Sequence, residues 1–279
     1  MNNTKGIITI SAVVAAAAIA VIIIAISISG TSQSETPTAP STAATTRVAT
    51  RDSAPTTAAL TTAAQTAEAP ATTEATTAKP TVSENSKIIN NFPLLNQLPE
   101  LPTGCETTSL AMVLKYCGLT ADKCDLADNY LEKGEFGKTD PNKAFIGDPR
   151  TENNSRGCYA PVIANAANKY LAAQGSDKKA SVITGTEFKD LFSYLDKNTP
   201  VIVWGTMDCN EPEATNVWEI DGQTIQWIRP EHCMVLVGYD LDKNLIYEAD
   251  PYYGEIKSYD INLFKSRYDS LYKQAVIIQ

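Results

Sequence analysis

Cys105 and His232 are the residues whose types could support nucleophilic catalysis. Cys105 stands in the stretch ELPTGCETTSLAMVLKYCG (100–118), and His232 is the single histidine of the 279-residue chain. A cysteine nucleophile needs a partner that accepts and returns a proton, and an imidazole suits that task. The competing interpretations are structural: a small apolar residue at a helix start, and a histidine that only begins a strand.

The residues around Cys105 predict a helix that begins beside it. Thr103 and Glu106 fit a capping box, in which the threonine caps the helix and the glutamate reaches back. An apolar stripe follows at i, i+3, i+4, i+7 spacing, and Gly118 suits the position after the helix. The stripe consists of Leu110, Val113, Leu114 and Cys117. Cys105 would lie in the first turn, where the helix dipole can lower a cysteine pKa below about 8.5.

A third residue follows from the strand that His232 begins. The stretch EHCMVLVGYD (231–240) is followed by a turn near 241–243 and by a second strand that ends in EADPYYG (248–254). The residue facing His232 is therefore Asp250 or one up to about four positions beyond it, on a strand about 5 Å away. Asp250 would accept a hydrogen bond from one imidazole nitrogen and leave the other for Cys105. Alternatively, Asp250 only opens an Asp-Pro turn.

The remaining patterns predict an α+β fold. Further helices are expected over 161–173, 187–196 (introduced by Thr184 and Glu187 in a second capping box) and 261–272. Strands rich in β-branched and aromatic residues are expected over 201–205, 224–228, 234–239, 245–249 and 275–279. Helices come early and mostly antiparallel-looking strands come late, which argues for an α+β fold rather than an alternating α/β fold. The stretch 133–159 has no periodicity, which indicates a functional segment or a missed element.

Residues 1–30 predict a transmembrane anchor. The run from Ile7 to Ser29 has no charge and no proline, and it is long enough to cross a bilayer core of about 30 Å. A cleaved signal peptide is the alternative, although its apolar region is usually only about 7–15 residues long. Lys5 precedes the run and the next positive residue is Arg47. The positive-inside rule then places the rest of the chain outside the cell membrane.

Residues 31–86 predict a disordered linker, and residues 87–279 a single folded domain. The linker is rich in Thr, Ala, Ser and Pro, so it buries too little apolar surface to offset its ordering entropy. The folded part is long enough for one domain with a proper core. The net charge of −9 argues against nucleic acid as a partner.

Five segments of the folded part together resemble the C-thirty-nine-like cysteine peptidases, papain-fold relatives of the peptidases that remove double-glycine leaders from bacteriocins. The segments are QLPELPTGCETTSLAMVLKYCG, NKAFIGDPR, GCYAPVIANAA, EHCMVLVGYD and EADPYYG. The resemblance covers nearly all of residues 87–279. It implies a papain-like α+β fold with the nucleophile on an early helix and the other catalytic residues on later strands.

The resemblance also implies a role for each candidate residue. Cys105 would be the nucleophile, His232 the general base and acid, and Asp250 the residue that orients His232. Gln97, eight residues before the cysteine, would join the Cys105 backbone N–H in an oxyanion hole. Taken by itself, Gln97 is a polar loop residue, so this last role depends on the resemblance alone.

The other cysteines indicate neither a metal site nor a settled disulfide. They are Cys117, Cys124, Cys158, Cys209 and Cys233. An odd number leaves at least one thiol unpaired or bonded between chains. Cys117 and Cys124 are one candidate pair, and Cys233 is expected in the core. Because the chain has no CxxC pair, we expect no metal and no other cofactor.

These patterns predict a membrane-anchored extracellular cysteine peptidase that acts through an acyl-enzyme thioester. Its partners would be a peptide or protein substrate, including cell-wall peptide, and the membrane. A cell-wall amidase or a transamidase could use the same three residues. A non-catalytic binding or adhesion module on a stalk is the alternative from a different class.

Overall fold

A computed structural model describes residues 85–279. The predicted anchor and nearly all of the predicted linker lie outside the described residues, although the first strand already begins at Ser86, the last linker residue. Within 85–279, none of the helices has the length and apolar character that crossing a membrane requires.

The described elements follow the predicted order, with several short additions. The helices are α1 (Cys105–Tyr116), α2 (Lys123–Asp125), a π-helix (Leu126–Tyr130), α3 (Ala160–Ala173), a 3₁₀ helix (Phe188–Leu191), α4 (Phe192–Asp196), a second 3₁₀ helix (Met207–Cys209) and α5 (Ile261–Ser270). The strands are β1 (Ser86–Ile88), β2 (Lys133–Gly134), β3 (Phe145–Ile146), β4 (Ala180–Val182), β5 (Val201–Thr206), β6 (Glu213–Ile220), β7 (Gln223–Arg229), β8 (Glu231–Asp240), β9 (Leu245–Asp250), β10 (Glu255–Asp260) and β11 (Ala275–Ile278).

The main sheet has seven strands and is antiparallel throughout. Its order is β10-β9-β8-β5-β11-β4, and β1 pairs with the far end of β8. Gly238 permits that last pairing, because a Cβ atom there would lie 2.4 Å from the Lys87 carbonyl oxygen. The mixed architecture of helices and an antiparallel sheet is therefore the one that the sequence predicts.

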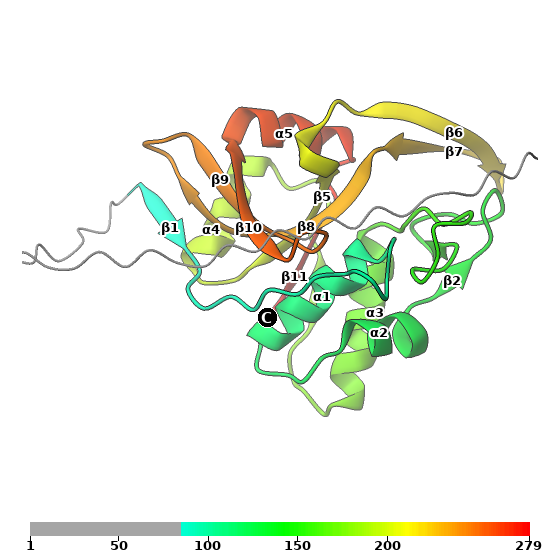
Figure 1. The fold of residues 1–279 in the computed structure, drawn as a ribbon, viewed down its shortest axis with the longest axis horizontal. Helices are drawn as coiled ribbons and strands as arrows, with labels where there is room; N and C mark the ends of the chain where they lie inside the picture. The colour runs from blue at the N-terminus through cyan, green and yellow to red at the C-terminus, as the bar shows by residue number, and fades with distance from the viewer. Residues whose placement is uncertain (1–84) are drawn as a thin grey trace, which may run out of the picture. The chain divides into compact units, whose positions relative to one another are not determined.

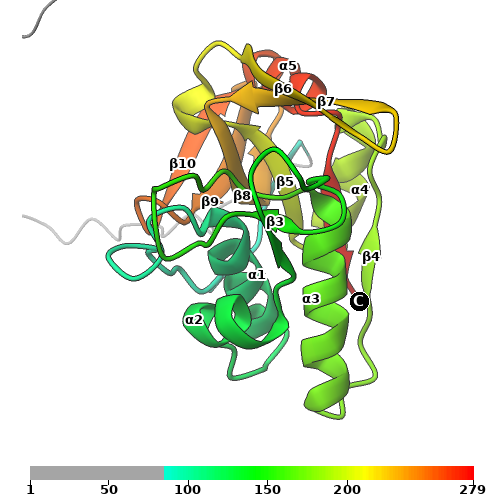
Figure 2. The same ribbon diagram turned by 90° about the vertical axis from the view of Figure 1, so that its right-hand side faces the viewer.

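Helices cover both faces of this sheet (Figures 1 and 2). Neighbouring residues of β5 identify what lies on each side. The Trp204 indole donates from Nε1 to the Cys158 carbonyl oxygen at 2.8 Å, on the side of α1 and α3. Gly205 faces the other way, since a Cβ atom there would lie 3.8 Å from the Arg267 Cβ atom of α5. Successive strand residues point to opposite faces, so the two contacts place α1 and α5 on opposite sides.

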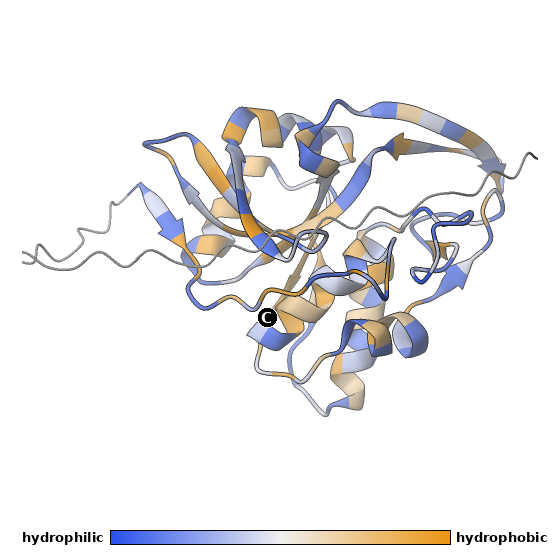
Figure 3. Cartoon of the chain, viewed as in Figure 1, coloured by the Kyte–Doolittle hydropathy of each residue, from blue (hydrophilic) through white to orange (hydrophobic). Residues whose placement is uncertain are grey.

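Helix α1 is enclosed rather than amphipathic. Every residue from Cys105 to Leu114 is buried, including four polar ones, because α1 packs against β5 and β8 as well as against α2 and α3. Orange, apolar stretches of α1 and of the central strands mark this core in Figure 3, whereas the loop after β2 is mostly blue. The single apolar stripe predicted for α1 therefore describes only part of its buried surface.

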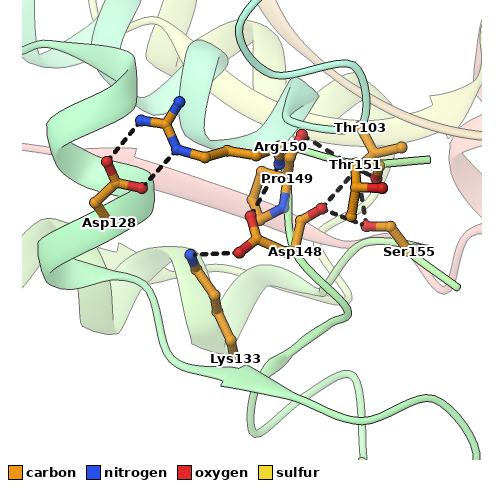
Figure 4. A network of polar contacts seen from close by, with 8 residues as sticks. All are labelled: Thr103, Asp128, Lys133, Asp148, Pro149, Arg150, Thr151 and Ser155. Atoms are coloured by element: carbon orange, nitrogen blue, oxygen red, sulfur yellow. Dashed lines mark hydrogen bonds and ion pairs between the residues drawn. The ribbon is translucent and has the colours of Figure 1, made fainter. Parts of the chain in front are cut away.

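The predicted capping box at α1 is wrong. Gly104 is the N-cap, and no side chain caps the helix. Thr103 instead donates from Oγ1 to the Thr151 carbonyl oxygen at 3.1 Å and lies 2.8 Å from Ser155 Oγ. Figure 4 shows that these contacts tie the residues before α1 to the segment 148–155. A threonine three residues before a glutamate fits a cap locally, but a distant segment provides better partners.

The same network holds residues 133–159, the stretch whose sequence has no periodicity. Arg150 pairs with Asp128 at 2.6 Å, and Lys133 pairs with Asp148 at 3.2 Å (Figure 4). The stretch contains a short parallel pair, β2 with β3, so it includes elements that were missed. Two-residue strands are too short to produce a detectable period.

Two longer strands, β6 and β10, were also missed, and one predicted helix is composite. None of the residues of either strand is buried, so neither strand has the regular apolar alternation of a half-buried strand. The predicted helix 187–196 is a 3₁₀ turn that continues into α4. Its predicted cap is wrong, since Thr184 donates from Oγ1 to Gln274 Oε1 at 3.1 Å.

Two glycines of the irregular stretch offer a test of its packing. Gly147 has a φ of +94°, and a Cβ atom there would lie 2.6 Å from Ser155 Cα, whereas Gly137 has a φ of +77° and open space. We expect Gly147→Ala to lower the free energy of unfolding by about 2–4 kcal/mol, the sum of backbone strain and overpacking. Gly137→Ala should cost only about 1 kcal/mol. Urea unfolding of the full chain measures both, and equal losses would contradict the close contact.

Candidate active site

Cys105 is the first residue of α1 and is only 7% exposed. Its thiol donates to Glu106 Oε2 at a Sγ–O distance of 3.3 Å. On the sheet side, α1 is joined to β8 by a hydrogen bond from Ser109 Oγ to the Cys233 carbonyl oxygen at 3.2 Å. The start of the helix is thus attached to the strand that carries His232.

The environment of the thiol is not the one that the helix start predicts. Burial raises the pKa of Cys105 well above its ordinary value, and the carboxyl groups of Glu106 and Glu231 raise it further. The Cys233 amide acts in the opposite direction but is outweighed. The predicted lowering of the pKa by the helix dipole is therefore wrong here, because desolvation and nearby carboxyl groups both disfavour the thiolate.

His232 and Asp250 form a buried pair on adjacent strands. His232 Nε2 lies 2.9 Å from Asp250 Oδ1, and both side chains are almost fully enclosed. Asp250 Oδ1 also accepts from the Tyr252 amide at 2.8 Å, while Lys257 Nζ lies 3.7 Å from Oδ2. Burial alone would raise the pKa of Asp250, but His232, the amide and Lys257 together hold it below its usual value. Asp250 is therefore the ionised partner of the imidazole.

The predicted hairpin accounts for this pair. β8 ends at Asp240 and β9 begins at Leu245, so the turn lies where the sequence indicates. The facing residue was assigned only to a window because the sequence does not give the centre of the turn, and the pairing also shifts register between Leu236 and Gly238. Asp250 lies at the near end of that window, and its expected contact with one imidazole nitrogen is present.

Cys105 and His232 are brought to the same part of the fold without being bonded to each other. Within residues 85–279 no hydrogen bond joins their side chains, because the thiol is directed to Glu106 and His232 Nε2 to Asp250. The two residues that flank His232 on β8 are the ones near α1: a Glu231 carboxylate oxygen lies within 4.8 Å of Cys105 Sγ, and the Cys233 carbonyl oxygen accepts from Ser109. A Cys–His proton transfer would require the thiol to turn away from Glu106.

Gln97 lies in the same region although it precedes α1 by eight residues. Its backbone N–H donates to the carbonyl oxygen of Pro251, the residue after Asp250, at 2.7 Å. Its side chain is 2% exposed and donates from Nε2 to the Pro102 carbonyl oxygen at 3.0 Å. Oε1 is buried without a hydrogen-bond partner. The structure therefore brings Gln97 beside the loop that follows Asp250 and leaves one amide atom unsatisfied.

Two glutamates that the sequence analysis did not assign to the site lie beside the thiol. Glu106 is fully buried, and its Oε1 accepts from the Cys158 amide at 2.7 Å. Glu231 precedes His232 on β8, and a carboxylate oxygen of each glutamate lies within 4.8 Å of Cys105 Sγ. Burial raises the pKa of Glu106 to about 7, and burial together with Glu106 raises that of Glu231 well above its ordinary value. A charged residue directly after the cysteine was the available signal, and it was assigned to a helix cap.

The same three side chains are the described group that is compact enough to hold a metal ion. An ion there would occupy the sulfur of the candidate nucleophile. We therefore interpret the two carboxyl groups as the environment of the thiol. All six cysteines of the chain are unpaired, so the candidate disulfide between Cys117 and Cys124 is not formed.

Comparisons with known proteins agree on one family. The model of the Peptidase C39 like family matches residues 89–276. YvpB of Bacillus subtilis (strain 168), itself uncharacterized, is 33% identical over 192 residues, which covers 67% of this chain and 74% of YvpB. A solved structure from Bacillus anthracis, classed with the C39-like peptidases, is 30% identical with a TM-score of 0.63 and covers 70% of this chain and 97% of that one. The family match includes all four candidate residues.

The charge beside Asp250 gives a testable dependence on pH. Because the pKa of Asp250 is lowered in the fold, its stabilising contribution is present above its unfolded pKa of about 3.9 and is lost as the pH falls below that value. Lys257→Met should raise the pKa of Asp250 and so remove about 0.5–1 kcal/mol of stability at pH 7 but little at pH 2. Urea unfolding at both pH values measures the difference.

Asp208 provides the control, since Lys257 also pairs with its carboxylate at the surface. Asp208→Asn removes that ion pair and leaves Lys257 beside Asp250. If Asp208→Asn alone reproduces the whole loss at pH 7, Lys257 does not act on Asp250.

Proposed function

Because the chain belongs to the Peptidase C39 like family, we propose that it is a cysteine peptidase with a papain-like fold, which cleaves amide bonds through Cys105, His232 and Asp250. The observation that carries the proposal is the buried 2.9 Å contact between His232 and Asp250, on a strand whose next residue, Cys233, is hydrogen-bonded to α1 through Ser109. A thiol at a helix start, an imidazole and a carboxylate that orients the imidazole are the groups that acyl transfer to sulfur needs.

Each residue has a defined task in this proposal. Asp250 binds Nε2, so Nδ1 is the nitrogen left to take the proton of the Cys105 thiol. The sulfur then attacks the substrate carbonyl carbon, and His232 returns the proton to the departing amine as the C–N bond breaks. The remaining thioester is hydrolysed by a water molecule that gives its proton to His232, and the free acid and the thiol are restored.

Gln97 and the Cys105 amide would stabilise the oxyanion formed in both steps. The Cys105 N–H belongs to the first turn of α1, where backbone donors have no partner within the helix. Gln97 would release the Pro102 carbonyl oxygen and turn its Nε2 toward the same place. Its unsatisfied Oε1 supports this movement, because the observed position is not one in which both amide atoms are bonded.

The substrate class and location in this proposal come from the sequence. The long apolar run near the N-terminus and the polar linker after it support a domain held outside the cell membrane, with a peptide or protein substrate that includes cell-wall peptide. The specific observation that favours the alternative, a non-catalytic binding module, is that the thiol is buried and bonded to Glu106.

Substitution of the proposed nucleophile separates these two functions. We expect the purified full chain to cleave members of a mixed library of peptides and cell-wall fragments, detected by mass spectrometry. Cys105→Ala and His232→Ala should each lower the rate by at least about 10³-fold, because each removes one partner of a unit. Cys117→Ala, at the other end of α1, should cleave normally. Unchanged cleavage by Cys105→Ala would sink the proposal, and no cleavage by the unaltered chain would favour the binding module.

The proposed oxyanion role of Gln97 has its own signature. Gln97→Ala should lower kcat by about 10- to 10³-fold and leave KM nearly unchanged, because the bond forms mainly in the transition state. Gln223→Ala, at the start of the β7 strand, is the control and should keep the kcat of the unaltered chain. A Gln97→Ala variant that changes only KM would assign Gln97 to substrate binding instead.

A further inference from the structure

The start of α1 carries a buried carboxyl group that the catalytic scheme does not use. Glu106 Oε2 accepts the Cys105 thiol at 3.3 Å, and Oε1 accepts the Cys158 amide at 2.7 Å. Both oxygens therefore have a donor, and one of the two donors is the proposed nucleophile. Glu106 touches the reacting sulfur in the observed state, whereas no hydrogen bond of the described residues joins that sulfur to His232.

A second carboxyl group completes the cluster from the opposite element. Glu231 lies within 4.8 Å of both Glu106 and Cys105, measured between oxygen and sulfur atoms, and its Oε1 is buried without a hydrogen-bond partner. Gly157 leaves room for the two groups, because a Cβ atom there would lie 2.5 Å from Glu106 Oε1 and 2.9 Å from Glu231 Oε2. Only glycine fits at position 157, because any side chain there would collide with both glutamates.

Within residues 85–279 no Lys or Arg forms an ion pair with either glutamate. The other titratable groups around the cluster come from the segment before α3 and from β8, and they are weak acids or already engaged. They are the thiols of Cys158 and Cys233, the phenol of Tyr159 and the imidazole of His232, which binds Asp250. Two carboxylates this close and without a cation cannot both ionise readily, so the pair retains a proton.

We propose that Glu106 and Glu231 share a proton beside Cys105 and hold the unliganded nucleophile as a neutral thiol. The inference deepens the proposed function, because it takes Cys105 as the nucleophile. The shared negative charge opposes formation of a thiolate, and the bond to Glu106 keeps the thiol proton away from His232. The directions of the pKa values agree, since the two carboxyl groups raise that of Cys105 and burial raises those of both glutamates.

The consequence is a nucleophile with low reactivity until it turns toward His232. The thiolate is the form of cysteine that alkylating agents and oxidants attack. A cysteine kept as a buried thiol is therefore protected from alkylation and oxidation while no substrate is bound. Glu106 is a catalytic-site residue in this scheme, because it contacts the sulfur. Glu231 acts through the proton it shares with Glu106 and through its own charge near the sulfur.

The pH dependence of Cys105 alkylation tests the proposal. The full chain is treated with iodoacetamide at pH 5–10 in the presence of EDTA, and modification is followed by mass spectrometry. The tryptic peptide that ends at Lys115 contains Cys105 as its only cysteine. We expect Glu231→Gln and Glu106→Gln each to move the alkylation profile to lower pH by about one unit or more, because each removes charge that opposes the thiolate.

The matched control is Glu248→Gln, which alters another buried glutamate whose pKa burial raises well above its ordinary value. This group lies on β9 and is not among the groups that raise the pKa of Cys105, so the profile should not move. Glu231→Gln keeps the bond from the Cys158 amide to Glu106, so it remains informative if Glu106→Gln does not fold. A purely structural role of the pair would lower stability without shifting the profile.

The outcomes separate this inference from the proposed function. Unshifted profiles in folded Glu231→Gln and Glu106→Gln chains overturn the shared proton, even if the unaltered chain cleaves peptides through Cys105. Shifted profiles in a chain that cleaves nothing support the shared proton and overturn the peptidase. A profile that shifts equally in Glu248→Gln overturns the assignment to Glu106 and Glu231.

Discussion

The arrangement of the site depends on the Glu106 carboxyl group, which is buried at the start of α1. A buried carboxyl group needs hydrogen-bond donors, since leaving it unpaired costs several kcal/mol. The donors here are the Cys105 thiol and the Cys158 amide, which belong to the candidate nucleophile and to the entry of α3. The Cys158 carbonyl oxygen in turn accepts from Trp204 of the central strand β5. One side chain thus connects the first helix, the second long helix and the sheet.

The His232 imidazole is held by a row of charged groups: it contacts Asp250, and Asp250 lies beside Lys257. His232, Asp250 and Lys257 come from three adjacent strands, β8, β9 and β10, so their spacing follows from the separation of about 5 Å between antiparallel strands. Lys257 also contacts Asp208 near the surface. Because the sheet sets these positions, the His232–Asp250 pair is preorganised, whereas the thiol has two possible partners. In the observed state the thiol is bonded to Glu106.

Several features of the site could be anticipated from local sequence. A cysteine before an apolar run indicates a helix start, the only histidine has no competitor as a base, and a short turn between two β-branched runs brings an aspartate within a few positions of that histidine. Strands β5, β8, β9 and β11 were predicted because their residues are buried and apolar. Strands β6 and β10 were not, since neither strand has a buried residue and so neither shows a regular apolar alternation.

The sequence by itself determined which residues are available for chemistry: one thiol at a helix start, one imidazole and one aspartate on a hairpin. Only the tertiary structure decided what surrounds them. Glu106 and Thr103 fit a local cap, yet their partners lie about fifty residues away in the segment 148–158. Glu231 reaches the thiol only because β8 packs against α1. Burial and long-range contacts depend on the assembly of the whole chain, and they reverse the direction that a helix start alone gives to the pKa of Cys105.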